Sequence, residues 1–202
     1  KDDRLLYYAR IGATAVLRTF SKRKGINLSQ KTLNFFEWSS RGLETNDGVN
    51  AFIKFESTDA RKAIVTGFDP FSLPSTPNKS NPSGLIALDF NNKSDFGSNS
   101  SPVIVRTAIF PVRFRHFGTP TQVTASGEEG IVEKVMKEGV KSSSLIMTCS
   151  QTSPGFYNVD RFATRYRTVQ NYDNEHQLSK VTLPSGSNAP YFLESTLPYY
   201  PY

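Results

Sequence analysis

The stretch Lys62-Ala63-Ile64-Val65-Thr66-Gly67 decides the fold of this chain. It is a short apolar run that ends at a glycine. Such a run is typical of a buried strand in a parallel sheet, and a glycine at its end is typical of a functional loop. We therefore expect the central sheet to start with this strand and a functional loop to follow Gly67.

Strand and helix signals alternate downstream of this run. We expect a short helix with a proline near its start over 84–90, a strand interrupted by proline over 103–114, an amphipathic helix over 128–141 and another strand over 144–148. The order strand, helix, strand, helix, strand is typical of an α/β protein. The sequence predicts a three-layer α/β fold with a mostly parallel central sheet flanked by helices.

An N-terminal helical extension precedes the sheet. Apolar residues recur at helical spacing from Leu5 to Phe20, while Arg10 and Arg18 occupy the other face. A second helix is expected over 29–41, capped by Ser29 and stopped by Gly42. The polar stretch over 91–101 indicates a loop. We divide the chain into a helical extension over 1–60, which we expect to pack against the main domain, and an α/β domain over 61–202.

Composition excludes several classes of protein. The net charge is +6, but the 24 Lys and Arg are dispersed, so we expect no nucleic-acid binding. Cys149 is the single cysteine, which excludes an internal disulfide and a cysteine-based metal site. No run approaches the roughly 20 apolar residues that a membrane span requires. We predict no metal, no cofactor and no membrane span, and the charged start Lys1-Asp2-Asp3-Arg4 is not the opening of a signal peptide.

Several short motifs occur in an order that matches one known family. Gly67-Phe68-Asp69-Pro70-Phe71 followed by Asn81-Pro82-Ser83 resembles the Gly-Phe-x-Pro-Phe and Asn-Pro-Ser signature of cysteine-type pyroglutamyl peptidases. Further segments that resemble this family in the same order are Phe110-Pro111-Val112-Arg113-Phe114, Tyr157 to Ala163, Asp173-Asn174 and Pro190 to Pro198. The resemblance covers about residues 61 to 198.

The resemblance implies a pocket for the lactam ring of an N-terminal pyroglutamyl residue. This ring is neutral and offers two flat faces, one amide N–H and one carbonyl, so aromatic contacts and a few hydrogen bonds suit it. Phe68 and Phe71 are the predicted ring contacts, and Gln151 lies near a glutamine that contacts the ring in many relatives. Spacing alone favours the alternative that both phenylalanines only fill the core beneath the first strand, and the matching Asn-Pro-Ser downstream reverses that preference.

The resemblance also assigns catalytic positions, with departures from the family pattern. Asp160 stands where the family has a glutamate that orients the catalytic histidine; alternatively it is a surface carboxylate paired with Arg161 or Arg165. Gln170 stands where the family has an arginine that serves the oxyanion hole, and Arg167 could supply that cation if the loop is rebuilt. These departures fit a binding module that has lost hydrolysis.

The family's nucleophilic cysteine and its histidine base lie beyond the matching segments, and this chain stops at Tyr202. We interpret Cys149, directly after a strand, as a partly buried structural cysteine, and His116 as an exposed residue at a strand end. His176 lies in a polar loop and completes no metal site with His116. The resemblance therefore implies a companion chain from the same precursor that carries Cys and His.

Three functions remain open. The first is a two-chain peptidase that removes N-terminal pyroglutamate from peptides, and the second is a binding module that keeps the Phe68 and Phe71 pocket but has lost hydrolysis. The third is an unrelated α/β interaction domain whose aromatic tail, Tyr199-Tyr200-Pro201-Tyr202, binds a partner. Relatives with a long helical arm resemble exported proteins, which favours export over the cytoplasm.

Overall fold

A computed structural model describes residues 2–48, 50–55, 61–73, 75–91, 93, 96–98, 101–113, 116, 130–151, 155, 158–164, 174 and 192–196. Its elements, in chain order, are α1 (Asp3–Lys24), α2 (Gln30–Ser39), β1 (Arg61–Phe68), α3 (Pro82–Phe90), β2 (Phe96–Ser98), β3 (Ser101–Phe110), α4 (Ile131–Ser142), β4 (Leu145–Thr148), β5 (Phe162–Thr164) and β6 (Phe192–Glu194).

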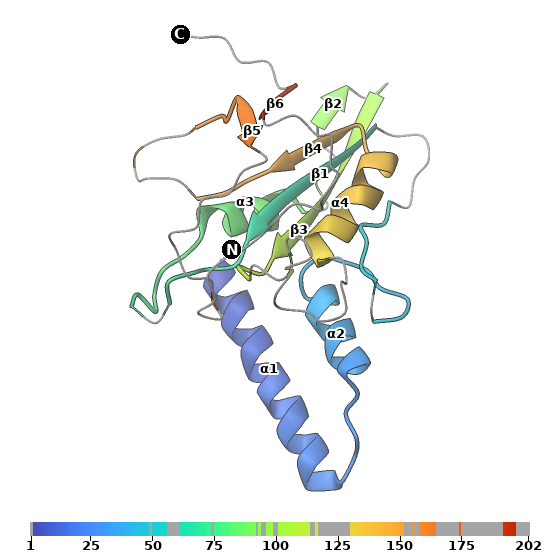
Figure 1. Ribbon diagram of the computed structural model, residues 1–202, viewed down its shortest axis with the longest axis vertical. Coiled ribbons are helices and arrows are strands. Elements are labelled where there is room, and N and C mark those ends of the chain that lie inside the picture. Colours follow the sequence, from blue (N-terminus) through green and yellow to red (C-terminus); the bar gives the residue numbers. More distant parts are fainter. Residues whose placement is uncertain are drawn as a thin grey trace.

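The central sheet has the strand order β2-β3-β1-β4. Strand β1 pairs in parallel with β3 and β4, and the register sets Phe68 opposite Phe110 and Thr66 opposite Thr148. Helix α3 covers one face of the sheet and α4 the other (Figure 1). The prediction of a three-layer α/β fold with a parallel sheet and an N-terminal helical part is confirmed.

The alternation of side chains along β1 divides the core between the two faces of the sheet. Ile64 packs in a cluster with Val135 of α4 and Trp38 of α2, whereas Val65 packs in a second cluster with Ile86 and Phe90 of α3. The buried middle of β1 is thus apolar on both faces, as parallel strands require.

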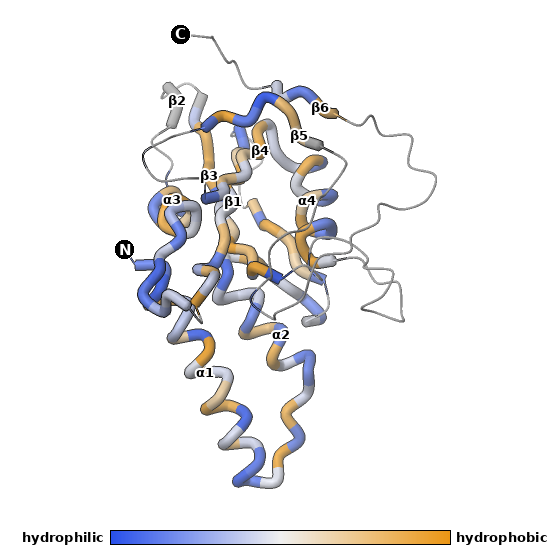
Figure 2. Tube along the Cα trace, turned by 60° about the vertical axis from the view of Figure 1, so that its left-hand side comes forward, coloured by the Kyte–Doolittle hydropathy of each residue, from blue (hydrophilic) through white to orange (hydrophobic). Residues whose placement is uncertain are grey.

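Helices α1 and α2 run antiparallel and project together from the end of the molecule at which β1 finishes (Figures 1 and 2). The side chain of Asp2 caps α1 by accepting from the N–H of Arg4, and Ser29 caps α2 by accepting from the N–H of Thr32. Gly25 ends α1 in the left-handed conformation. These caps explain where α1 and α2, which together form the arm, begin and where the chain turns between them.

The prediction for the faces of α1 was wrong. Arg10 is buried with 3% of its surface exposed, whereas Leu5, Val16 and Phe20 are exposed. The stripe that faces the protein includes Asp3, Arg10 and Ser21, which still follow helical spacing. Apolar periodicity found the helix but chose the wrong face, because Asp3 and Arg10 bond to groups far away in the sequence.

Two boundaries also differ from the prediction. The strand expected to continue beyond Pro111 ends at Phe110, since proline has no N–H to donate to the ladder. Part of the predicted loop over 91–101 forms β2, which pairs antiparallel with the start of β3. Neither change affects the carboxyl end of β1, where the candidate site lies.

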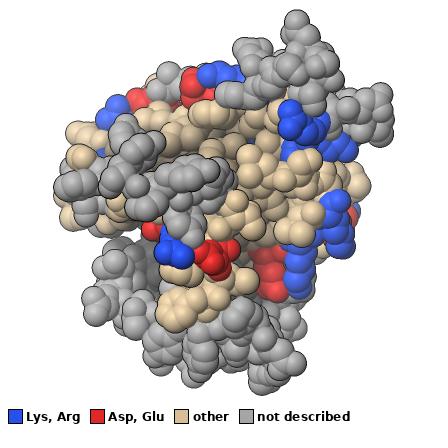
Figure 3. Space-filling model, turned by 90° about the horizontal axis from the view of Figure 1, so that it is seen from above, with Lys and Arg blue, Asp and Glu red and all other residues tan. Residues whose placement is uncertain are grey.

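The far end of the molecule carries a small ribbon made by β5 and β6 (Figures 1 and 2). Figure 3 views this end and shows lysine and arginine side chains in separate patches. Several lysines pair with acidic neighbours, including Lys137 with Glu133 and Lys141 with Glu138 on α4. Among the described residues, no helix has both the length and the apolar character that crossing a membrane requires.

Candidate functional site

The loop after β1 and the start of α3 form one hydrogen-bonded unit. Asn81 donates from Nδ2 to the carbonyl of Asp69 at 2.9 Å, and the N–H of Phe68 donates to Ser83 Oγ at 3.1 Å. Asn81 Oδ1 in turn accepts from the N–H and the hydroxyl of Ser83, capping α3. The Asn-Pro-Ser motif therefore braces the Gly-Phe-Asp-Pro-Phe loop, which explains why the two motifs occur together.

Gly67 is required by this close approach. A Cβ at Gly67 would overlap the backbone carbonyl of Ser83. The absence of a side chain lets the end of β1 lie directly against the first turn of α3. The loop after Phe68 thus starts from a fixed position.

A third segment, far away in the chain, closes on the same loop. Asn174 donates from Nδ2 to the carbonyl of Pro70 at 2.8 Å, and its N–H donates to the carbonyl of Val112 at 3.0 Å. The N–H of Asp69 donates to the carbonyl of Phe110 at 2.9 Å. Asn174, from the matching segment Asp173-Asn174, therefore reaches the carboxyl ends of β1 and β3, whereas Asp173 lies outside the described residues.

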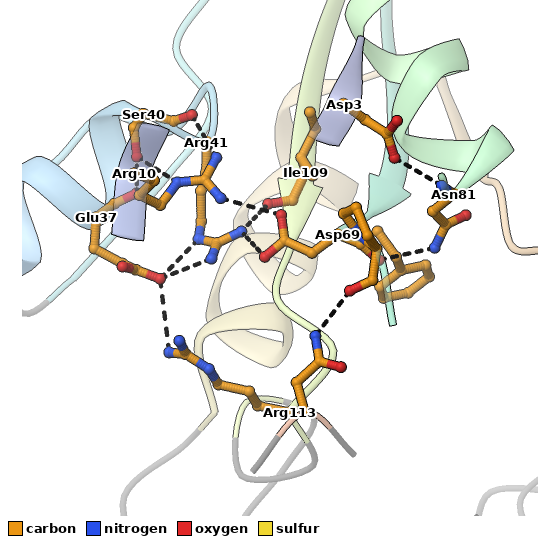
Figure 4. Close-up of polar contacts among 12 residues, drawn as sticks. Asp3, Arg10, Glu37, Ser40, Arg41, Asp69, Asn81, Ile109 and Arg113 are labelled. Carbon is orange, nitrogen blue, oxygen red and sulfur yellow. Dashed lines mark hydrogen bonds and ion pairs between the residues drawn. The ribbon is translucent and has the colours of Figure 1, made fainter. Parts of the chain in front are cut away.

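The side chain of Asp69 anchors the loop to both helices of the arm (Figure 4). Its Oδ1 lies 3.1 Å from Arg10 Nη1 and its Oδ2 lies 2.7 Å from Arg41 Nη1. Arg10 also donates to the hydroxyl and the carbonyl of Ser40, and Arg41 donates to Glu37 Oε1 at 2.8 Å. Both guanidinium groups are buried and paired, so this ion cluster, made of Arg10, Glu37, Arg41 and Asp69, fixes the loop.

Burial and mutual interaction shift the ionisation of this cluster. Burial, together with repulsion from Arg41, lowers the pKa of Arg10. For Glu37, burial acts to raise the pKa, but the charge and hydrogen bonds of Arg41 and the charge of Arg113 outweigh it and lower the pKa. Because the folded pKa of Glu37 is lowered, its contribution to stability is present above the unfolded pKa and is lost as the pH falls through the folded value.

The two predicted ring contacts lie differently. Phe68 is half-buried and packs against the core, with its ring centroid 6.4 Å from that of Phe110. Phe71 is also half-buried, and Lys79 Nζ lies 4.3 Å from its ring centroid. Phe68 thus serves the core in part, as the alternative interpretation held, while Phe71 lies on the braced loop itself.

Gln151 follows β4 at the same edge of the sheet. The N–H of Cys149 donates to the carbonyl of Thr66 at 2.9 Å, which extends the pairing of β4 with β1 toward Phe68. Gln151 Oε1 is buried and has no hydrogen-bond partner in the part of the chain that the structure describes. A buried acceptor without a donor costs about 1–3 kcal/mol, so this oxygen is suited to accept from a ligand N–H.

The structure describes only one of the predicted catalytic positions, Asp160. Asp160 is exposed just before β5, and Arg161 pairs with Glu194 at 3.0 Å. Gln170, Arg167 and His176 lie outside the described residues. Among the described residues, Phe68, Phe71, Gln151 and Asn174 lie at the carboxyl edge of the sheet, whereas Asp160 is exposed.

Cys149 has the environment of a structural thiol. It is half-buried and packs against Ala63, Val65 and Val105, and burial raises its pKa. A raised pKa reduces the fraction of reactive thiolate. His116 is half-buried with its ring edge-on to Trp38, at 5.6 Å between centroids, so the prediction that it is exposed was wrong.

Sequence reasoning missed the ion cluster entirely. Arg10 and Arg41 lie far from Asp69 in the sequence, so no local sequence pattern indicates that they pair with it. The capping role of Asn81 had a usable signal, since an asparagine followed by proline commonly begins a helix.

Comparison with known proteins shows which family the α/β part of the chain matches. Residues 62–195 match the family described as PA0049, C-terminal domain. The uncharacterized protein PA0049 of Pseudomonas aeruginosa strain PAO1 is 29% identical over 134 residues, which cover 62% of this chain and 24% of that protein. The chain thus spans about a quarter of the length of the curated relative it matches. No solved structure matches this chain. The matched residues include all of the strands from β1 to β6 apart from Arg61, and the chain belongs to the PA0049 C-terminal domain family.

Proposed function

We propose that this chain carries the ring-binding site of a pyroglutamyl-peptidase-like α/β hydrolase, a cysteine-type peptidase that removes N-terminal pyroglutamate from peptides. In this proposal a further polypeptide segment supplies the nucleophilic cysteine and the histidine base. The thiolate attacks the carbonyl carbon between pyroglutamate and the next residue, and histidine delivers a proton to the leaving amine. Water then releases pyroglutamate from the thioester.

The observation that carries this proposal is the braced loop from Gly67 to Phe71. Its backbone carbonyls at Asp69 and Pro70 are bound by the carboxamides of Asn81 and Asn174, respectively. A loop held in this way keeps Phe71 in one place, and a preorganised flat surface loses little entropy when it binds a small ring. The motifs that resemble the peptidase signature are the ones that build this brace.

Gln151 provides the second element of recognition. A lactam differs from a purely apolar ring by its N–H and its carbonyl, and specificity for it requires a hydrogen-bonding partner. The buried Oε1 of Gln151 is an acceptor without a donor among the described residues. In the proposed complex it accepts from the lactam N–H while Phe71 contacts a ring face.

In this proposal the nucleophile comes from outside this chain, because its single thiol, Cys149, packs beside the sheet and burial raises the pKa of that thiol. Asp160, the predicted orienting carboxylate, is exposed just before β5. This exposure favours a second candidate, a binding module that holds pyroglutamyl ligands without hydrolysing them. Under the peptidase proposal, the companion segment covers Asp160 when the site is assembled.

Hydrolysis of a pyroglutamyl amide by the native material, with its intact mass measured under denaturing conditions, separates these candidates. We expect a second polypeptide that carries Cys and His, together with turnover that a thiol-alkylating agent abolishes. The same sensitivity in a Cys149→Ser variant assigns the nucleophile to the companion, because this chain then has no thiol. A single folded 22.6 kDa species without turnover would contradict the peptidase and leave the binding module.

A further inference from the structure

Helix α1 holds the segment just before Asn81 in place. Arg4 donates from Nη1 to the carbonyl of Asn78 at 3.1 Å, and the hydroxyl of Ser80 donates to Asp3 Oδ1 at 2.6 Å. The N–H of Asn81 donates to the other oxygen of Asp3 at 2.7 Å. Lys79 lies between these anchored residues, so its backbone is fixed on both sides by the N-terminal end of α1.

From this position Lys79 reaches over the proposed ring site. Its ammonium lies 4.3 Å from the centroid of Phe71, a distance typical of a cation–π contact. The contact places the ammonium over one face of Phe71, and in the proposed complex the ligand ring contacts the other face. It also holds the ammonium group next to the site, whereas an unrestrained lysine side chain would sample many positions in solvent.

This charge differs from the other cations near the loop. Arg10 and Arg41 are paired with Asp69, and Arg41 is also paired with Glu37. Lys93 also lies over an aromatic ring, but it is paired with the carboxylate of Asp89. Lys79 lies over Phe71 and has no carboxylate partner in the described part of the chain. Lys79 is therefore available to pair with an anion that a ligand brings.

We propose that Lys79 makes the site selective for pyroglutamyl ligands that carry a carboxylate close to the lactam ring. This inference rests on the proposed function and deepens it by naming the charge of the ligand. The carboxylate belongs either to free pyroglutamate or to an acidic residue that follows pyroglutamate in a peptide. A neutral lactam binds through Phe71 and Gln151 alone, whereas the acidic ligand also pairs with the ammonium.

The test is a set of binding titrations by calorimetry at low ionic strength. For the wild-type chain we expect L-pyroglutamate to bind about two- to fivefold more tightly than neutral L-pyroglutamide, within the range for one ion pair at a protein surface. Lys79→Gln should abolish this difference and leave pyroglutamide affinity unchanged, and Lys79→Arg should keep it. Added salt should reduce the preference, because an accessible ion pair is screened.

Lys93→Gln is the matched control, since it removes a lysine that also lies over an aromatic ring, at 5.5 Å from Phe90. It should leave the preference intact. Pyroglutamyl-glutamate amide compared with pyroglutamyl-glutamine amide separates the peptide source from the free acid, and a preference that depends on Lys79 in either comparison supports the proposal. Binding of pyroglutamide with no such preference in either comparison overturns this inference and leaves the proposed ring site standing. Absence of binding by every ligand overturns both.

Discussion

Replacing Asp69 by asparagine is expected to lower the free energy of unfolding by about 3–5 kcal/mol, the cost of breaking a buried ion pair from one side. Arg10 and Arg41 each bond to a different oxygen of this carboxylate, and their side chains are only 3% and 1% exposed. An amide offers one acceptor oxygen and turns a donor toward the other guanidinium. Urea unfolding followed by the fluorescence of Trp38, the single tryptophan and a buried one, measures the change.

The matched control for this change is Asp89→Asn. Asp89 pairs with Lys93 one helical turn away, but its side chain is 59% exposed. Exposed pairs of this spacing contribute about 0.3–0.5 kcal/mol, so this variant should unfold almost as the wild type does. Equal stability of the two variants would show that the ion cluster does not anchor the loop to the arm.

Gly67→Ala is expected to destabilise the fold by about 3 kcal/mol or more, through overpacking against rigid backbone. The added Cβ would overlap the carbonyl of Ser83, and neither β1 nor the capped start of α3 has room to move. Because the same contact sets the position of the ring loop, we also expect pyroglutamide binding to be lost. Thermal unfolding and calorimetric titration of one preparation measure both effects.

Gly12→Ala gives the opposite expectation for the same chemical change. Gly12 lies inside α1, and a Cβ there would meet nothing within 4 Å. Alanine in an exposed helix interior is favoured over glycine by about 0.5–1 kcal/mol, so this variant should be more stable than the wild type. If Gly67→Ala were as stable as the wild type, the tight contact between β1 and α3 would be wrong.

The sequence predicted the features that local patterns encode. The apolar run before Gly67 identified β1, the helix expected over 84–90 with a proline near its start identified α3, and the order of elements identified the parallel sheet. Each of these depends on residues within a few positions of one another. Strands that are buried on both faces and helix caps can be recognised from the local sequence alone, without knowledge of the rest of the fold.

The sequence did not predict contacts that join distant segments. The sequence around Arg10 is typical of a solvent-facing residue on an amphipathic helix. Arg10 is nevertheless buried, because its guanidinium donates hydrogen bonds to Asp69 and Ser40. The hydrogen bond from Asn174 to Pro70 joins residues 104 positions apart in the sequence, so no local sequence pattern indicates it. The resemblance indicated which motifs matter for the site, but only the structure shows that they brace one another.

The most direct test of the account is the binding of L-pyroglutamide to the wild-type chain, to Phe71→Ala and to Phe20→Ala, measured by calorimetric titration. Phe20 is an exposed phenylalanine on α1, so its loss controls for removing an aromatic ring elsewhere. The account predicts saturable binding by the wild type and by Phe20→Ala, and a loss of about tenfold or more in Phe71→Ala. No saturable binding by the wild type, or equal binding by the two variants, would contradict a lactam site on the Gly67 to Phe71 loop.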